Sequence, residues 1–134
     1  MNLLTLHKQY LIYKLYIFSA VDVTSIVMTQ SFPPLNAVGN RVSLTCETDS
    51  ANPAPQIEWR MGSEKIYNGE TFSILWSDLP GLYNADYQTS TLSFIAMQPY
   101  SGYTFECSVL NRSLSDSSVL YLKCESNMHC LTTS

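Results

Sequence analysis

Charge is scarce in this sequence, and the few charges that it carries do not gather. Only 13% of the 134 residues are charged, with 7 Lys and Arg against 11 Asp and Glu, which gives a net charge of -4. No cluster of Lys and Arg stands out, so the electrostatic footprint of a protein that binds nucleic acid or an anionic membrane is missing. We therefore predict that nucleic acid is not a partner.

Residue patterns that enzymes use are also scarce. The 2 histidines, His7 and His129, lie in opposite tails of the chain. Both fall outside the expected core, so we expect neither a Ser–His–Asp nor a Cys–His catalytic apparatus. A glycine-rich phosphate loop is absent as well. We predict that the protein is not an enzyme, and that it takes no cofactor and no small-molecule substrate.

The 4 cysteines include no C-x-x-C pair, which argues against zinc-ribbon and thioredoxin-like motifs. Cys124, His129 and Cys130 stand close together, but a polar tail offers neither a fourth ligand nor a rigid frame, so we predict no metal site. Cys124 and Cys130 could bridge each other, pair with another domain or stay free. A local bridge between them is the favoured alternative.

A long hydrophobic run is lacking too, since the apolar run near the N-terminus covers only residues 15–21. That is too short to span a bilayer. Lys14 before it is typical of a signal peptide, whereas Phe18 stands where a small residue is wanted before the cleavage site. Residues 1–22 are therefore either a signal peptide or an incomplete N-terminal segment. We expect any membrane attachment to come only through a segment absent from this chain.

Apolar and aromatic residues are plentiful by contrast. Hydrophobic residues make up 46% of the chain, with 9 Tyr and 5 Phe, which is too apolar for disorder and favours β structure. From Val23 onward, short alternating segments are separated by proline, glycine and asparagine, a pattern typical of a β-sandwich. We predict strands over residues 25–30, 41–47, 56–61, 65–67, 71–76, 89–96, 103–109 and 118–123.

The length of the chain fits one domain. We place this domain at residues 23–124 and a polar C-terminal tail at residues 125–134.

Two cysteines and one tryptophan stand out within the predicted strands. Cys46, Trp59 and Cys107 each fall on the apolar face of an alternating segment. Their order and phase are typical of the immunoglobulin sandwich, in which a disulfide joins strands of opposite sheets and a tryptophan packs against it. The resemblance implies a disulfide between Cys46 and Cys107, with Trp59 as the core tryptophan.

Longer stretches resemble C2-type immunoglobulin domains of nephrin-like and Sidestep-like adhesion receptors and of CD80-like molecules. Residues 52–59 (NPAPQIEW) resemble their B–C loop and C strand, and residues 102–111 (GYTFECSVLN) resemble their F strand. Residues 91–94 (TLSF) are similar to the E strand. The resemblance implies an all-β fold, an immunoglobulin-like antiparallel Greek-key sandwich of two sheets.

Two positions depart from the family pattern. Phe105 stands where the family usually has a corner tyrosine, and a phenylalanine cannot make that hydroxyl hydrogen bond. Ser101 stands where variable-type domains usually carry an aspartate, although residues 26–31 (IVMTQS) resemble the start of an antibody κ light chain. We therefore predict a C2-like or intermediate domain and not a true variable domain.

The family resemblance implies an extracellular module of a cell-surface receptor that recognises a cell-surface or extracellular protein in adhesion, whether homophilic or heterophilic. Two alternatives stay open, because a sandwich fold alone does not name a partner. The protein could be a secreted immune or decoy protein, or a structural spacer domain in a multi-domain array.

Two further features concern the surface. Asn111-Arg112-Ser113 is an N-glycosylation sequon, expected at the F–G turn, which makes Asn111 a candidate glycan site. Four aromatic residues could form a recognition surface, because Tyr and Trp are enriched at binding hot spots. Ordinary packing at the rim of the sandwich is the favoured interpretation for them. They are Trp76, Tyr83, Tyr87 and Tyr100.

Overall fold

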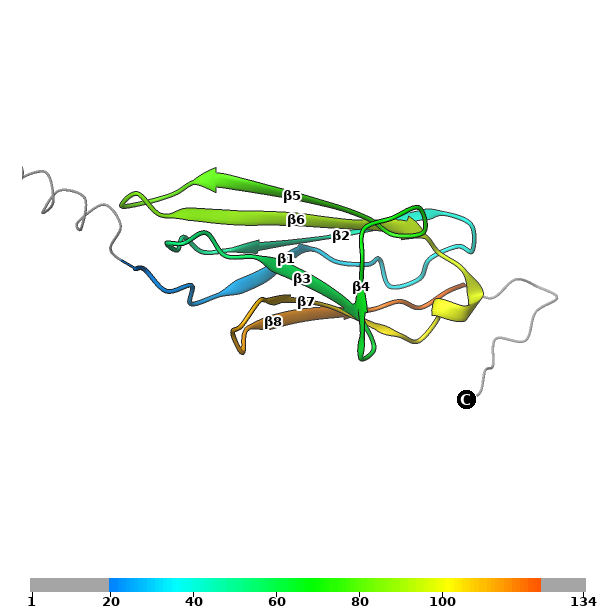
Figure 1. Cartoon of the computed structure of the whole chain (residues 1–134). Helices are drawn as coiled ribbons and strands as arrows, with labels where there is room; N and C mark the ends of the chain where they lie inside the picture. The colour runs from blue at the N-terminus through cyan, green and yellow to red at the C-terminus, as the bar shows by residue number, and fades with distance from the viewer. Residues whose placement is uncertain (1–19, 124–134) are drawn as a thin grey trace, which may run out of the picture.

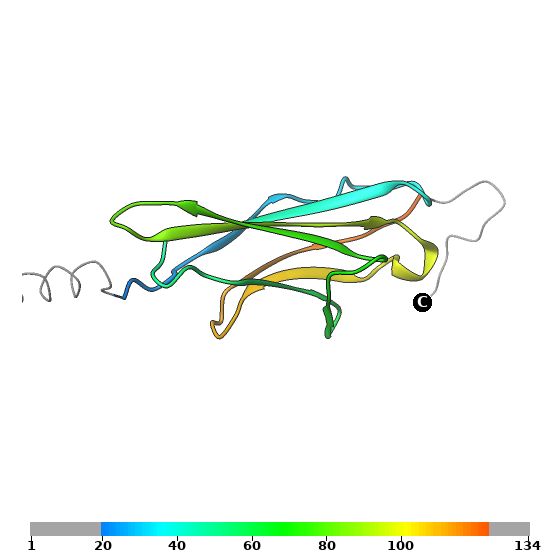
Figure 2. The ribbon, with the colours of Figure 1, turned by 45° about the horizontal axis from the view of Figure 1, so that its top comes forward.

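The computed structural model describes residues 20–123. Predictions about residues 1–19, Cys124, Cys130 and the tail at 125–134 lie outside the described residues. Two sheets of four strands each form the layers of a sandwich (Figure 1). The described chain enters at one end of this sandwich and leaves at the other, as Figures 1 and 2 both show.

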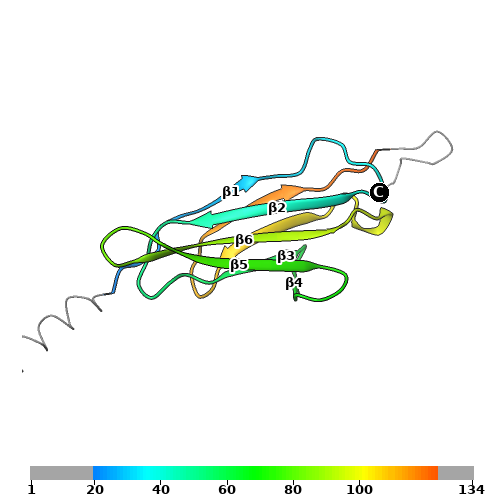
Figure 3. The same cartoon turned by 90° about the horizontal axis from the view of Figure 1, so that it is seen from above.

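All six strand pairings are antiparallel; four join strands that are consecutive in the chain, whereas β2 with β6 and β3 with β7 pair strands that are far apart in it. One sheet has the order β1-β2-β6-β5 and lies nearer the viewer in Figure 3, and the other has the order β4-β3-β7-β8. This confirms the predicted all-β, two-sheet antiparallel sandwich. The strands are β1 (Ile26–Gln30), β2 (Arg41–Thr48), β3 (Ile57–Met61), β4 (Glu64–Ile66), β5 (Ser73–Pro80), β6 (Asp86–Ile95), β7 (Thr104–Val109) and β8 (Ser115–Val119), with a 3-10 turn at Gln98–Tyr100.

The predicted segments correspond to these strands with two corrections. The last strand, β8, lies at 115–119 and not at 118–123. Leu120 and Leu122 are buried, but they lie beyond the end of β8. The strand predicted at 71–76 ends too early, since β5 runs from Ser73 to Pro80. A proline is tolerated there because β5 is an edge strand.

The core lies between the sheets because alternate side chains of each strand point inward. Cys46 on β2 is buried as predicted, together with Val42 and Leu44 on the same face. The predicted strand at 103–109 starts one residue too early, since Tyr103 is 46% exposed. The strand begins only after it, at Thr104.

Three phenylalanine rings join the two layers. Phe105 on β7 stacks on Phe94 of β6, with ring centroids 4.8 Å apart. Phe32 meets the edge of Phe105 at a centroid distance of 5.4 Å. Phe105 is fully buried, so it fills the place of the corner tyrosine with apolar contact alone.

The chain after β1 changes sheets and closes one side of the sandwich. Asn36 forms a parallel bridge with Leu122, in which the backbone N–H of Asn36 donates to Tyr121 O at 2.9 Å. The N–H of Lys123 donates to Asn36 O at 2.7 Å. Side chains of β8 extend the closure, because Asp116 Oδ2 accepts the N–H of Met28 at 2.8 Å.

Candidate recognition site

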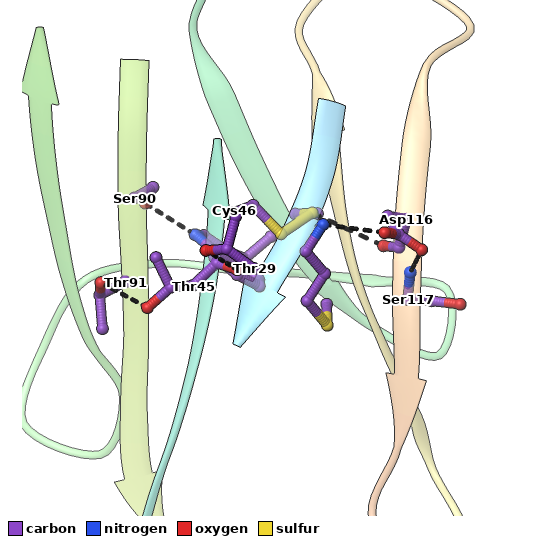
Figure 4. Close-up of a disulfide and its surroundings, with 10 residues drawn as sticks. Thr29, Thr45, Cys46, Ser90, Thr91, Asp116 and Ser117 are labelled. Atoms are coloured by element: carbon purple, nitrogen blue, oxygen red, sulfur yellow. Dashed lines mark hydrogen bonds between the residues drawn. A yellow bond between two sulfur atoms is a disulfide. The ribbon is translucent and has the colours of Figure 1, made fainter. Parts of the chain in front are cut away.

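A buried disulfide joins the two sheets. Cys46 on β2 and Cys107 on β7, 61 residues apart, form the predicted bond, and both residues are fully buried. Figure 4 shows the bond crossing between the layers. Trp59 on β3 lies opposite Cys107 in the strand register and is also fully buried. Its Nε1–H donates to Ser90 Oγ on β6 at 2.9 Å, so a hydrogen bond spans the sheets beside the disulfide.

The sequon residue Asn111 lies in the turn between β7 and β8, where its side chain is exposed. Its φ of 63° is in the left-handed region, which asparagine adopts more readily than most residues. Arg112, the next residue, pairs with Asp22 of the N-terminal segment at 3.2 Å. The turn is therefore exposed and tied to the N-terminal end of the domain.

Charges of both signs are paired on the outer face of the β4-β3-β7-β8 sheet. Glu58 on β3 lies 3.1 Å from Lys65 Nζ and 3.6 Å from Arg60 Nη2, and its side chain is only 12% exposed. A hollow of about 710 Å³ lies over the same face and the Asn111 turn. Glu58, Glu106 and Arg112 are among its lining residues. This arrangement can present a fixed pattern of charge to a partner.

The outer face of the other sheet is different, because short hydroxyl side chains cover its centre. Ser43 Oγ and Ser93 Oγ are 2.9 Å apart across β2 and β6. Thr45 Oγ1 and Thr91 Oγ1, which Figure 4 shows, are 3.0 Å apart. This face was not predicted from the sequence. Its signal was present, since Ser and Thr alternate with apolar residues in the segments predicted as these two strands.

The four aromatic residues considered above do not form one surface. Tyr100 packs on Phe94 with ring centroids 5.6 Å apart, and Trp76 Nε1–H donates to Ile57 O at 2.9 Å, as the packing interpretation predicted. Tyr83 is 89% exposed at the tip of the β5–β6 hairpin. Tyr83 and Asn84 both have positive φ there, at 53° and 58°.

Asp49, just after β2, anchors the N-terminal segment. Its carboxylate accepts the backbone N–H of Thr24 at 2.9 Å and of Ser25 at 3.1 Å, and also the hydroxyl of Thr24. Partial burial by itself raises the pKa of this carboxyl. The hydrogen bonds, led by that from the Thr24 hydroxyl, favour the charged form and hold the pKa below its ordinary value.

Two antiparallel sheets, joined by a buried disulfide with a tryptophan beside it, define an immunoglobulin-type sandwich. The family model for the immunoglobulin domain matches residues 26–111, and the chain belongs to this family. In the family's nomenclature the sheets correspond to A-B-E-D and C′-C-F-G, with no C″ strand among residues 20–123. The C2 subtype stays a prediction.

Solved structures share the fold at low sequence identity. The crystal structure of Rst D1-D2 matches with a TM-score of 0.65 and 15% identity, over 78% of this chain and 51% of that chain. The M1 domain from titin matches with a TM-score of 0.56 and 20% identity, over 75% and 96%. The full ectodomain of mouse nectin-like molecule 4 matches with a TM-score of 0.53 and 17% identity, over 77% and 34%. The chain thus spans about half the length of Rst D1-D2.

A sequence comparison with curated proteins found no match. Across residues 20–123, no helix is long and apolar enough to cross a membrane.

Proposed function

We propose that this protein is an extracellular recognition module of a cell-surface adhesion receptor, and that its partner is another protein. The observation that carries the proposal is the buried Cys46–Cys107 disulfide. Structural disulfides form and persist in oxidising compartments and are rare in the cytosol. The fold alone does not decide the matter, because a titin domain and a nectin-like ectodomain both share it.

The surface proposed for this recognition is the outer face of the β4-β3-β7-β8 sheet. Glu58 holds Lys65 and Arg60 in place, so the charges are presented from a rigid sheet. Fixed charges favour a partner with the complementary pattern and repel others. The hollow beside them adds a concave surface that a partner side chain can enter.

Asn111 is the proposed glycan site on the same side of the domain. It lies among the residues that line the hollow, and its side chain is exposed. A glycan is bulky and well solvated, so it would restrict a partner's approach from the turn between β7 and β8.

Non-reducing peptide mapping of protein secreted from eukaryotic cells tests the extracellular part of the proposal. The sequence has no Lys or Arg between Lys65 and Arg112, so trypsin leaves Cys107 and Asn111 in one peptide. We expect this peptide linked to the one that contains Cys46, with a mass that falls after glycosidase treatment. Free thiols at both cysteines, or failure of secretion, would contradict an oxidised extracellular module. An unchanged mass would remove only the glycan.

A binding experiment tests the proposed surface. A multimer of the secreted protein is used to stain a panel of cells, and Lys65→Glu is compared with wild type. We expect the Lys65→Glu multimer to bind the stained cells with about tenfold lower affinity than wild type, which corresponds to about 1.4 kcal/mol. Lys123→Glu is the matched control, because it makes the same charge change at an exposed position near the end of the described chain. Equal losses in both variants would contradict a role for this face.

A structural spacer is the second candidate function. The described chain enters and leaves at opposite ends of the sandwich (Figure 1), as a domain in a linear array requires. Wild-type protein that stains no cell in the panel would favour this alternative.

A further inference from the structure

The outer face of the β1-β2-β6-β5 sheet is nearly free of charge. Its centre consists of hydroxyl residues from β2 and β6, which alternate with buried core residues along each strand. Three exposed apolar side chains on neighbouring strands share the face, because each pairs in the register with an outward residue. They are Val27 opposite Glu47, Leu75 opposite Thr91, and Ile95 opposite Arg41.

Four hydroxyl groups at the centre of this face are already hydrogen-bonded in pairs. Ser43 pairs with Ser93 and Thr45 with Thr91, at 2.9 and 3.0 Å. Covering a polar group costs free energy mainly when the group is left without a partner. A second surface can therefore cover these residues at low cost, and their short side chains allow a sheet to approach to about 10 Å.

Only two charged side chains lie on the outward positions of β2, one near each end. Arg41 begins the strand and Glu47 stands one residue before its end, and both are exposed. Neither takes part in an ion pair within residues 20–123. At about 3.3 Å per residue, the two positions are about 20 Å apart along the strand.

We infer that this face is a self-association surface on which a second copy of the chain docks face to face. Consider a two-fold axis that lies between the two faces, runs perpendicular to the strands and passes over β2 at the level of Leu44. This axis places β2 over its copy with the two strands in opposite directions. Arg41 of each copy then faces Glu47 of the other, so one symmetry operation pairs both charges at both ends. The same operation stacks the hydroxyl centres and brings the apolar side chains into the contact.

The inference goes beyond the proposed function, because the recognition face and the Asn111 turn belong to the other sheet and stay uncovered.

The size of the sheet sets the expected affinity of the dimer. Four strands about 4.8 Å apart and about 26 Å long give roughly 500 Å² for each copy, which is at the low end of specific interfaces. We expect a reversible dimer with a dissociation constant on the order of 10 μM.

Sedimentation equilibrium of the secreted, disulfide-bonded chain over a concentration series tests the inference. Wild type should dimerise reversibly. Arg41→Glu and Glu47→Arg each place like charges together at both ends, so each variant alone should dimerise at least about tenfold more weakly. An equimolar mixture of the two variants should form a heterodimer, because each substituted residue then faces its complement. The double variant Arg41→Glu/Glu47→Arg should regain the homodimer.

Glu64→Arg is the matched control, since it makes the same charge change on β4 of the opposite sheet and should leave dimerisation unchanged. Wild type that stays monomeric up to about 1 mM overturns the inference. So do single variants that dimerise like wild type, or a mixture that fails to form the heterodimer. None of these outcomes bears on the staining experiment with Lys65→Glu, so the two proposals can fail separately.

Discussion

The indole of Trp59 depends on one hydroxyl group in the core. Trp59 is fully buried, and Ser90, which accepts its Nε1–H, is only 1% exposed. A buried donor that loses its partner keeps the cost of leaving water without the compensating bond. The small buried serine therefore has a definite structural role.

Replacing this serine should destabilise the domain. We expect Ser90→Ala to lower the free energy of unfolding by about 1–3 kcal/mol, because the indole N–H is left unpaired. Urea unfolding monitored by tryptophan fluorescence measures the change. Ser77→Ala on the edge strand β5, where the side chain is exposed, is the control and should shift stability by less than about 0.5 kcal/mol. Similar losses in both variants would contradict this role.

Gly81 allows the β5–β6 hairpin to approach the loop after β2. A Cβ atom at this position would lie 2.0 Å from Ser50 Oγ and 3.0 Å from Ala85 O. We expect Gly81→Ala to cost about 1–3 kcal/mol through this overlap, measured by thermal unfolding. Gly69→Ala is the control, because a Cβ there has no atom within 4 Å. If the control is destabilised as much, the close approach is not the cause.

Sequence alone identified the cysteines and the tryptophan but not their neighbours, for a physical reason. Cys46, Trp59 and Cys107 belong to a pattern that is visible along the chain as phase and order. The partnership of Ser90 with Trp59 depends on how two sheets face each other, and the space beside Gly81 depends on a loop 31 residues earlier. Neither relation leaves a periodic signal.

Strands could be located from the sequence only where they carry a periodic pattern. β2, β3 and β6 were found because inward apolar residues alternate with polar ones along them. β8, with the sequence SDSSV, has no such alternation. Its position is set by pairing with β7 and by the side-chain bond from Asp116 to β1. An edge strand without an apolar face must be found through its neighbours.

The contact between Asp49 and the segment before β1 should depend on pH. The pKa of Asp49 is lowered in the folded state, so its charged form stabilises the fold above the unfolded-state pKa. That contribution is lost as pH falls through the lower, folded-state pKa. We expect wild type to be more stable than Asp49→Asn at neutral pH. The difference should be constant down to about pH 5 and close below about pH 4.

Thermal unfolding of both proteins between neutral and acidic pH measures this difference. Asp86→Asn is the control for a general effect of removing one negative charge, since Asp86 is exposed on β6. A difference for Asp49→Asn that persists unchanged into strong acid would show that the charge is not responsible.

For the whole molecule, the fold was predictable and the surfaces were not. The spacing of Cys46, Trp59 and Cys107 within alternating segments is specific to one architecture, so these residues were enough to predict the class of fold. The charged face and the hydroxyl face each combine residues from several strands. Which strands become neighbours depends on the topology of the chain, which local patterns do not specify.

The disulfide should account for a large share of the stability of the domain. Closing a loop of 61 residues contributes about 4 kcal/mol in the chain-entropy description, because it restricts the unfolded chain. We expect the double variant Cys46→Ala/Cys107→Ala to unfold about 15–30 °C below wild type in a thermal scan. Wild type treated with a reductant after unfolding is the comparison and should refold to the same lowered midpoint. An unchanged midpoint in the double variant would contradict the assignment.

The closure between Asn36 and the chain beyond β8 has a mechanical consequence. The two ends of the described chain leave the sandwich in opposite directions, and the chain at Asn36 runs parallel to the chain at Leu122. A pull on the ends therefore loads the hydrogen bonds of Asn36 in shear, so that they bear the force together and do not peel apart in sequence. If they yield, the disulfide still withholds its 61-residue loop from extension. Under force, the domain would lengthen only by the segments outside the disulfide loop, so its extension would have a fixed upper limit.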